Sequence, residues 1–214
     1  MSVLPKLIVF DLDACIWLPE VYELPSSPSI PVVSNGLVSA LRCSKQSGRG
    51  GRGRRGDDSD DDGDDQTQTL RLFPATLALF QDIFTNRNGI YKGVQWGVAS
   101  SSLQPDYSHL GLELLEVFPG QNLKSLFDPR LVQVGRTGKL TSRKTTHFAL
   151  LKAESGIEYS DMLFFDDCGW DDHVADLNQA LGVVGVRTPT GVGSNEFLQG
   201  LALFQASKQT KKQK

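Results

Sequence analysis

The apolar residues of this chain occur in short runs that alternate with longer amphipathic stretches. The run Leu7-Ile8-Val9-Phe10 has the length and composition of a strand buried on both faces. An alternation of this kind predicts an α/β fold, a Rossmann-like, doubly wound and mostly parallel sheet with helices on both faces. Strands are predicted at 7–10, 94–99, 131–134, 162–165 and 183–186, and helices at 74–84, 110–118, from about 143, 172–181 and 195–204.

Polar side chains follow several of the predicted strands. In an open sheet of this type the ligand crevice lies beyond the carboxyl ends of the strands, so these residues are expected to lie near one another. The first strand is followed by Asp11 and Asp13, the second by Ser100-Ser101-Ser102, and the strand at 162–165 by Asp166-Asp167.

Asp11 and Asp13 stand one residue apart at the end of a core strand. Because side chains alternate across a strand, the two carboxylates are expected to point the same way. Their repulsion costs stability unless a cation lies between them or one of them carries a proton. Taken alone, the pair is better explained as a solvated strand exit, so the other strand ends decide the matter.

Together the strand ends supply a consistent set of groups. Carboxylates from two distant strands are the hard oxygen ligands that magnesium prefers. Ser100, and Lys144 at the start of a predicted helix, supply donors for an anion. A metal and a lysine that neutralise charge on a transferring group are typical of phosphoryl transfer.

Length and composition bound the class of protein. The 214 residues, 39% of them hydrophobic, suit one globular domain, expected over 1–206. The apolar start ends at Asp11, too early for a membrane span, and lacks the features of a signal peptide, so the cytoplasm is expected, with the nucleus as the other compartment. Cys15, Cys43 and Cys168 show neither zinc nor disulfide spacing and are expected to be reduced. A net charge of -3 suggests neither a nucleic-acid nor a membrane partner.

The segment 44–68 interrupts the pattern with Gly, Arg and Asp. It cannot bury apolar surface, so a disordered loop insertion is expected. An Arg-Gly segment that contacts RNA is less favoured, because a block of seven Asp residues follows the five basic ones. The residues 207–214 are expected to form a basic, flexible tail.

Four elements in order resemble the motifs of the haloacid dehalogenase (HAD) superfamily: Asp11-Leu12-Asp13, Ser100, Lys144 and Asp166-Asp167. The Asp-x-Asp element alone is weak evidence, whereas the ordered set of four is strong. Within the superfamily the chain is most similar to the magnesium-dependent phosphatase family, over about residues 4–186 without the charged loop. Further matching segments are Leu4-Pro5-Lys6-Leu7, Trp17, Leu114-Leu115-Glu116, Thr146-His147-Phe148 and Phe164-Phe165.

The resemblance implies a HAD-like fold with a minimal cap and a role for each motif residue. Asp11 is implied as the nucleophile that forms an aspartyl-phosphate, and Asp13 as the general acid and base. Magnesium is implied as the cofactor, held by Asp11, the Asp13 carbonyl and Asp167, with Asp166 nearby. The implied phosphate and substrate contacts come from Leu12, Ser100, Ser101 and Lys144.

Three features depart from the family pattern. Cys15 stands where threonine or valine is usual, Ser101 replaces an arginine common after the motif serine, and the charged loop is unexpected. Loss of that arginine removes a bidentate phosphate contact and puts substrate preference in doubt more than the reaction.

Each motif residue also has a structural explanation. Taken singly, Ser100 is explained equally as a polar strand exit, Lys144 as an exposed helix residue, and Asp166-Asp167 as a cap of the next helix. His147 is expected to be a packed helix residue, and Asp171 and Asp172 to serve as helix caps rather than in the metal's second shell. His173 is assigned to the surface or core, and Cys168 is expected to be structural.

Other functions fit the sequence less well than a phosphatase does. Cys43 to Arg49 has the Cys-x5-Arg spacing of cysteine-dependent phosphatases, but no apolar strand is expected before it and no helix after it. A receiver-like phospho-acceptor domain would place its phosphorylated aspartate on a middle strand, where this chain has Ser100. A non-catalytic interaction protein acting through the charged loop would not need Asp11, Asp13, Lys144 and Asp167.

The substrate is expected to be a phosphorylated small molecule or a phosphoprotein. The superfamily inserts a cap in the segment between Leu18 and Leu70, and its composition here supports only a small one. An open site would admit a phosphotyrosine side chain, as in a protein tyrosine phosphatase, a phosphosugar or a phosphorylated glycated amine. The sequence does not choose among these or indicate an oligomeric state.

Overall fold

The computed structural model describes residues 3–44, 69–168 and 171–212. All but the first residue of the predicted insertion 44–68 therefore lies outside the described residues.

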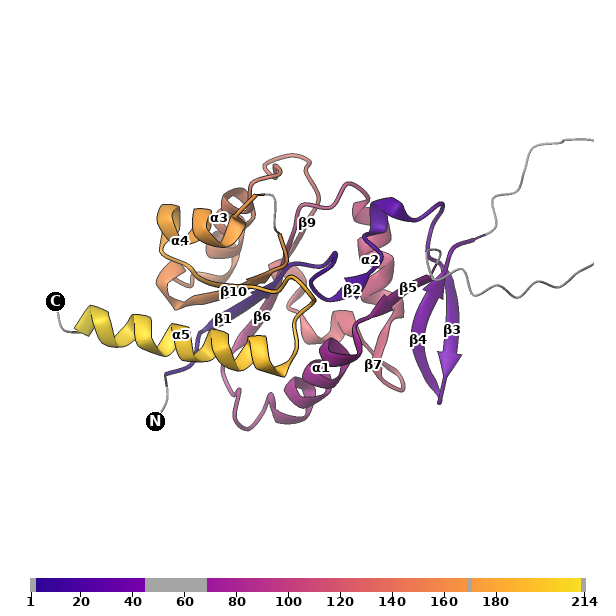
Figure 1. The fold of residues 1–214 in the computed structure, drawn as a ribbon, viewed down its shortest axis with the longest axis horizontal. Coiled ribbons are helices and arrows are strands. Elements are labelled where there is room, and N and C mark those ends of the chain that lie inside the picture. Colours follow the sequence, from indigo (N-terminus) through magenta and orange to yellow (C-terminus); the bar gives the residue numbers. More distant parts are fainter. Residues whose placement is uncertain (1–2, 45–68, 169–170, 213–214) are drawn as a thin grey trace, which may run out of the picture.

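A five-stranded sheet of parallel neighbours forms the centre of the molecule, as predicted (Figure 1). Its strand order is β11-β10-β1-β6-β9. Helices cover both faces, which confirms the α/β class and the doubly wound arrangement. The strands are β1 (Leu7–Phe10), β6 (Gln95–Ser100), β9 (Val132–Val134), β10 (Met162–Asp166) and β11 (Val184–Arg187), and the helices are α1 (Pro74–Asn86), α2 (Pro105–Leu114), α3 (Lys144–Ser155), α4 (His173–Leu181) and α5 (Ser194–Lys212).

Alternate residues of β1 enter two separate hydrophobic clusters. Ile8 and Phe10 pack in the cluster that includes residues of α1 and α5. Leu7 and Val9 pack in the cluster formed with α3 and α4. All four side chains are fully buried, so both faces of this strand belong to the core. The same alternation assigns the next residue, Asp11, to the face covered by α3 and α4.

The strand order reverses at β1. From β1 the chain proceeds outward through β6 and β9, and it then crosses to β10 on the other side of β1. Phe10 pairs with Phe165 in the register of β1 and β10, so Asp11 and Asp166 follow directly side by side. A ligand crevice is expected at such a switch point, beyond the carboxyl ends of the strands.

A second, antiparallel sheet lies beside the central one, at the right in Figure 1. No such sheet was predicted from the sequence. The dipeptide Asn35-Gly36 is the sequence signal for it, since Asn-Gly is typical of a two-residue hairpin turn. In the structure both residues have positive φ (52° and 76°) and form the turn between β3 and β4. Its strands, in the order β2-β5-β4-β3, are β2 (Trp17–Leu18), β3 (Ile30–Ser34), β4 (Leu37–Arg42) and β5 (Thr69–Leu72).

Two predicted boundaries differ from the structure. The helix expected at 110–118 begins earlier, at Pro105, which suits the first helical turn, and it ends at Leu114. The residues after it form β7 (Glu116–Phe118), which pairs with β8 (Gln121–Asn122).

The predicted flexible tail at 207–214 begins inside a helix. Helix α5 continues to Lys212, well beyond the predicted end at residue 204. Lys208 forms an ion pair with Asp161, which attaches this turn of the helix to the segment before β10.

Among the helices of the described residues, none is both long and apolar enough to cross a membrane.

Phe197 attaches α5 to the sheet. Its ring lies 5.8 Å from that of Phe165 and 6.4 Å from that of Trp96, and its side chain is 1% exposed. We expect Phe197→Ala to lower the free energy of unfolding by about 3–5 kcal/mol through the cavity it leaves. Leu198, the next residue, is 61% exposed, so Leu198→Ala should change it by less than about 0.5 kcal/mol. Urea denaturation of both variants measures the difference, and equal losses would contradict this account of the packing.

Candidate active site

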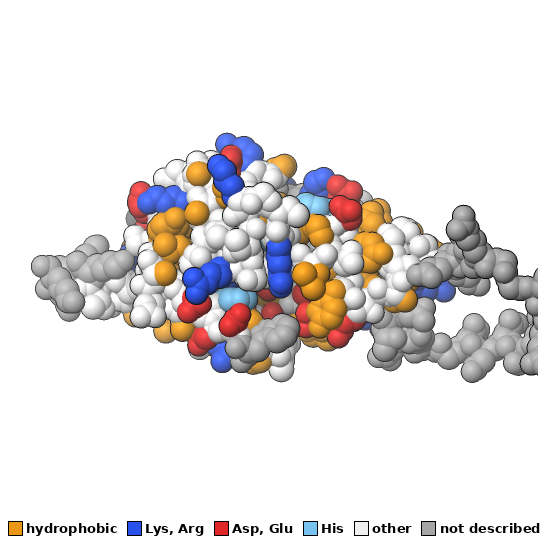
Figure 2. Space-filling model, turned by 90° about the horizontal axis from the view of Figure 1, so that it is seen from above, with side chains coloured by type: hydrophobic (Ala, Val, Ile, Leu, Met, Phe, Trp, Pro, Cys, Tyr) orange, Lys and Arg blue, Asp and Glu red, His pale blue; other side chains and the backbone are white. Residues whose placement is uncertain are grey.

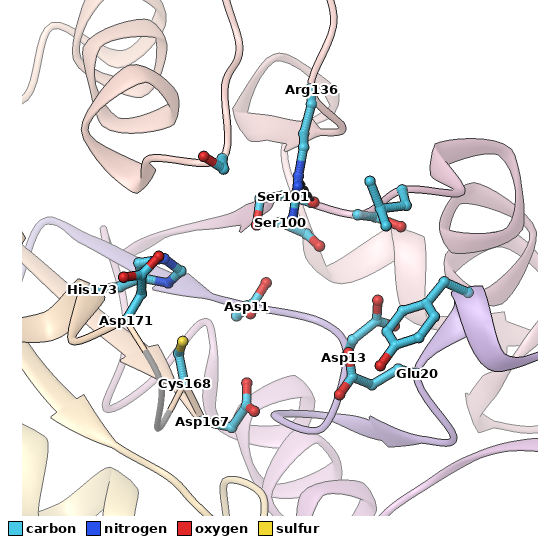
Figure 3. Close-up of a pocket in the computed structure, with 14 residues that line it drawn as sticks. Asp11, Asp13, Glu20, Ser100, Ser101, Arg136, Asp167, Cys168, Asp171 and His173 are labelled. Carbon is cyan, nitrogen blue, oxygen red and sulfur yellow. Dashed lines mark hydrogen bonds between the residues drawn. The ribbon is translucent and has the colours of Figure 1, made fainter.

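A cavity of about 560 Å³ opens at the switch point. Figure 2 shows this face of the molecule, with acidic side chains at the bottom of a hollow, basic side chains and a histidine on one side and hydrophobic side chains on the other. Figure 3 shows the lining residues, which come from the ends of separate strands and from the loops after them. The lining is Asp11, Asp13, Glu20, Tyr22, Ser100, Ser101, Ser102, Leu103, Arg136, Ser142, Asp167, Cys168, Asp171 and His173.

Lys144 does not line this cavity, but its side chain contacts Asp11, which does, and it is 2% exposed. Its ammonium lies 2.7 Å from Asp11 Oδ1 and 3.4 Å from Asp166 Oδ2, and it donates a hydrogen bond of 2.8 Å to the carbonyl of Ala99. Burial favours the neutral amine, but the two carboxylates outweigh it and raise the pKa of Lys144 to about 12. The exposed-helix explanation of Lys144 is therefore wrong.

Asp11 is buried at the base of the cavity. Burial raises the pKa of its carboxyl group, and the charge of Lys144 opposes this shift. Oδ1 accepts no hydrogen bond within the described part of the chain. Its 2.7 Å contact with Lys144 is thus an ion pair that lacks hydrogen-bond alignment.

The acidic residues supply a donor set for a cation. Asp11, Asp166 and Asp167 each offer one carboxylate oxygen, and these atoms all lie within 4.8 Å of one another. Burial, followed by the charges of Asp11 and Asp166, raises the pKa of Asp167 to about 7. Burial and mutual repulsion oppose the ionisation of all three carboxyl groups at once, and Asp11 Oδ1 accepts no hydrogen bond from the described residues. Both features fit the binding of a hard divalent ion such as Mg²⁺.

Asp13 is held in a turn that follows β1. Its Oδ1 accepts hydrogen bonds from the indole of Trp17 at 2.7 Å and from the backbone N–H of Val21 at 3.1 Å. Helix α2 has Gly111 where it meets Trp17, because a Cβ there would lie 3.0 Å from two ring atoms. Burial, opposed by the Trp17 hydrogen bond, raises the pKa of Asp13 to about 7. A carboxyl group with this pKa exchanges protons near neutral pH.

Asp166 faces away from solvent toward Lys144. Burial disfavours its charge, but Lys144, His173 and the Cys168 backbone N–H outweigh this and lower its pKa. Neither Asp166 nor Asp167 caps the next helix, since the side chain of Asp172 accepts the capping hydrogen bond from Ala175. The predicted capping role of Asp172 is therefore confirmed.

The predicted phosphate-binding residues are placed differently from one another. Ser100 lines the cavity, and its hydroxyl has no hydrogen-bond partner among residues 3–44, 69–168 and 171–212. Ser101 also lines the cavity, and its carbonyl accepts a 2.7 Å hydrogen bond from Arg136 Nε. Leu12 has a fully buried side chain in the core, so only its backbone can contact a ligand.

His147 is buried, as the sequence analysis expected. Its Nε2 lies 3.0 Å from the carbonyl of Ser100 and 3.2 Å from that of Gly135. A carbonyl can only accept, and Nε2 faces two of them at shorter range than the 3.3 Å between Nδ1 and the Arg143 carbonyl, so these contacts favour the tautomer in which Nε2 carries the proton and donates to both. Burial and the nearby Lys144 charge lower the pKa of His147, and the neutral ring holds together the loops that follow β6 and β9.

Several lining residues were missed or assigned other roles. Arg136 lies on a loop, and Glu20 and Tyr22 belong to the short 3-10 helix Val21–Glu23 and its N-cap, so none of them directly follows a strand of the central sheet. Asp171, expected as a helix cap, and His173, assigned to the surface or core, both line the cavity.

Cys43 does not line this cavity. It follows β4 directly, so the expectation that no strand precedes it was wrong. Its side chain packs against the hydrophobic core, and Arg49 lies outside the described residues.

Comparison with known proteins assigns the family. A family model described as Acid Phosphatase matches residues 3–207. The chain belongs to the acid phosphatase family. This membership confirms the resemblance drawn from the four motifs and the predicted enzyme class, a phosphatase, over the receiver-like and non-catalytic alternatives.

Individual relatives of this acid phosphatase family member were also found. Magnesium-dependent phosphatase 1 of Homo sapiens is 29% identical over 204 residues, which cover 95% of this chain and 89% of that protein. A crystal structure of CbbY from Rhodobacter sphaeroides in complex with phosphate has a TM-score of 0.48, with 13% identity over 86% of each chain. A hydrolase from Pseudomonas syringae has a TM-score of 0.37 and 15% identity, over 91% of this chain and 97% of that one.

Lys144 compensates two buried carboxylates, so its removal should destabilise the protein. We expect Lys144→Met to lower the free energy of unfolding by about 3–5 kcal/mol, because Asp11 and Asp166 lose their counter-charge. Lys139 is exposed, and Lys139→Met should leave stability within about 0.5 kcal/mol of the original chain. Denaturation by urea with excess chelator tests both, and an unchanged Lys144→Met midpoint would disprove the role of this ion pair.

Proposed function

We propose that this phosphatase hydrolyses phosphate monoesters with Mg²⁺ as its cofactor, through an aspartyl-phosphate intermediate. The observation that carries the proposal is the cluster of Asp11, Asp166 and Asp167 oxygens within 4.8 Å of one another, with Lys144 buried against it. The human relative is named a magnesium-dependent phosphatase, which supports the choice of metal.

Mg²⁺ would be held by the carboxylates of Asp11 and Asp167 and by the backbone carbonyl of Asp13, with Asp166 nearby. When bound, the ion supplies positive charge that offsets the carboxylates and the phosphoryl group. Asp166 remains the counter-charge of Lys144, which its lowered pKa favours.

Asp11 is the proposed nucleophile. Its carboxylate oxygen attacks phosphorus, a bond forms between Asp11 and the phosphoryl group, and the ester oxygen leaves with the electron pair of the broken P–O bond. The adjacent Lys144 ammonium favours the ionised form of Asp11 against the effect of burial, and it balances the charge of the phosphoryl group.

Asp13 is the proposed general acid and base. Its Oδ1 already accepts two N–H donors, so the proton is carried on Oδ2. Asp13 gives this proton to the leaving ester oxygen and later takes one from the water that hydrolyses the aspartyl-phosphate. The pKa of about 7 allows both steps near neutral pH.

Ser100 and Arg136 are the proposed phosphate contacts beside Lys144. The Ser100 hydroxyl is positioned to donate to a phosphoryl oxygen. Arg136 is the only arginine or lysine among the described residues that line the cavity, and its Nε–H is anchored on the Ser101 carbonyl. Arg136 thereby supplies a guanidinium group next to Ser101, which stands where the family pattern has an arginine.

The rim of the cavity suggests the class of substrate. Tyr22 and Leu103 line it and are 47% and 59% exposed, so they offer apolar contact to the organic part of an ester. The cavity of about 560 Å³ suits a small phosphorylated molecule, such as a phosphosugar, or a phosphotyrosine side chain.

The first test is hydrolysis of para-nitrophenyl phosphate by the original chain and by Asp11→Asn, each with Mg²⁺ and with excess chelator. We expect turnover only with Mg²⁺ and Asp11, since the nucleophile and the metal act on the same phosphoryl group. Borohydride quenching during turnover should reduce the acyl phosphate and leave Asp11 as an alcohol, which mass spectrometry detects.

Cys43→Ser is the control for this test, and its activity should stay within about twofold of the original, because Cys43 does not line the cavity and serine is close to cysteine in size. Loss of activity in Cys43→Ser with retention in Asp11→Asn would overturn the aspartate mechanism in favour of a cysteine nucleophile.

Arg136 offers a separate test of phosphate binding. We expect Arg136→Met to lower kcat/KM by about tenfold to a hundredfold, the value of one hydrogen bond to a charged group. Arg130, whose partner is the nearby Asp128 at 2.7 Å, provides the matched control Arg130→Met, for which kcat/KM should not change. Steady-state kinetics with para-nitrophenyl phosphate decide the matter, and equal values for the two variants would exclude a phosphate contact by Arg136.

A further inference from the structure

A second group of ligand atoms lies beside the acidic cluster and differs from it in chemistry. Asp166, Cys168 and His173 offer a carboxylate oxygen, a thiol sulfur and an imidazole nitrogen, all within 4.8 Å of one another. His173 Nδ1 lies 3.4 Å from Asp166 Oδ2. The backbone N–H of Cys168 donates to Asp166 Oδ1 at 2.9 Å, so the turn that carries the sulfur is fixed on the same carboxylate.

We propose that Asp166, Cys168 and His173 bind Zn²⁺. Thiolate and imidazole ligands favour zinc, whereas magnesium requires oxygen donors, so the two ligand groups select different ions. Three protein ligands leave the fourth position of a tetrahedral zinc site for water. The shared residue is Asp166, which stands between the two groups.

An ion can reach this site from the cavity. Cys168 and His173 both line it together with Asp11 (Figure 3). His173 also borders a second cavity of about 300 Å³ between α3 and α4. The carboxylates of Asp11, Asp166, Asp167 and Asp171 lie around the site, and their combined charge attracts a cation.

Zinc at this site would affect the neighbouring chemistry through Asp166. That carboxylate lies 3.4 Å from the Lys144 ammonium, and Lys144 contacts the proposed nucleophile Asp11. A Zn²⁺ ion bound to Asp166 withdraws the counter-charge of Lys144 and adds positive charge beside it. Zinc therefore inhibits hydrolysis even when Mg²⁺ is saturating. The inhibition rests on the proposed function, but the binding of zinc does not.

Cobalt substitution tests the binding directly. Co²⁺ is added to the full chain without Mg²⁺, and the near-ultraviolet thiolate-to-cobalt absorption band is followed. The band should appear in the original chain, persist in Cys43→Ser, disappear in Cys168→Ser and be bleached by an equivalent of Zn²⁺. His173→Gln, at a half-buried position, should weaken Co²⁺ binding about tenfold or more. Circular dichroism confirms that each variant is folded.

Absence of the band in the original chain, or its persistence in folded Cys168→Ser, would overturn the site. If Cys168→Ser does not fold, the affinity of His173→Gln decides the question, and an unchanged value would overturn it.

Inhibition is measured separately, as the Zn²⁺ concentration that halves para-nitrophenyl phosphate hydrolysis at saturating Mg²⁺. Each variant is compared with its own zinc-free rate, and the half-inhibiting concentration should rise about tenfold or more in Cys168→Ser. If the cobalt band depends on Cys168 but zinc inhibits Cys168→Ser and the original chain equally, the zinc site is supported and its inhibitory role is overturned. A normal cobalt band in a chain without hydrolysis would instead count against the proposed function.

Discussion

The ammonium of Lys144 is the interaction on which the rest of the site depends. It is buried, and it forms ion pairs with Asp11 and Asp166 and a hydrogen bond with the Ala99 carbonyl; these three residues come from the ends of β1, β10 and β6. Three neighbouring strands of the sheet are thus joined at their carboxyl ends to the first residue of α3. Without that positive charge, two adjacent buried carboxylates would repel each other, and the crevice between the strands would not be stable in this form.

The alternation of side chains along β1 and β10 places these groups on one face of the sheet. Asp11 continues the face of Leu7 and Val9, and Asp166 continues the face of Met162 and Phe164, and that face is covered by α3 and α4. The small antiparallel sheet contributes on the other side, because Trp17 in β2 holds Asp13 through its indole N–H. One carboxylate is therefore oriented by a charge and the other by hydrogen bonds, and their environments differ accordingly.

The sequence was sufficient to predict what depends on local pattern. The five central strands, and the convergence of Asp11, Asp13, Ser100 and Asp167 at one cavity, follow from buried runs and the polar residues after them. Arg136 was not predictable, because its position depends on a loop conformation and on a hydrogen bond to the distant Ser101 carbonyl. The hairpin at Asn35-Gly36 was predictable in principle, because the turn residues themselves are a local signal for it.

The shared use of Lys144 by three partners also restricts how the protein can change over time. Replacement of Lys144 leaves two buried carboxylates without their counter-charge. Replacement of Asp166 or of Asp11 alone leaves the buried ammonium with one carboxylate fewer. Each single substitution in this group therefore produces a protein with an unbalanced buried charge. Coordinated replacement of all three residues avoids that barrier, so descendants of this protein should either retain the whole triad or have lost it together.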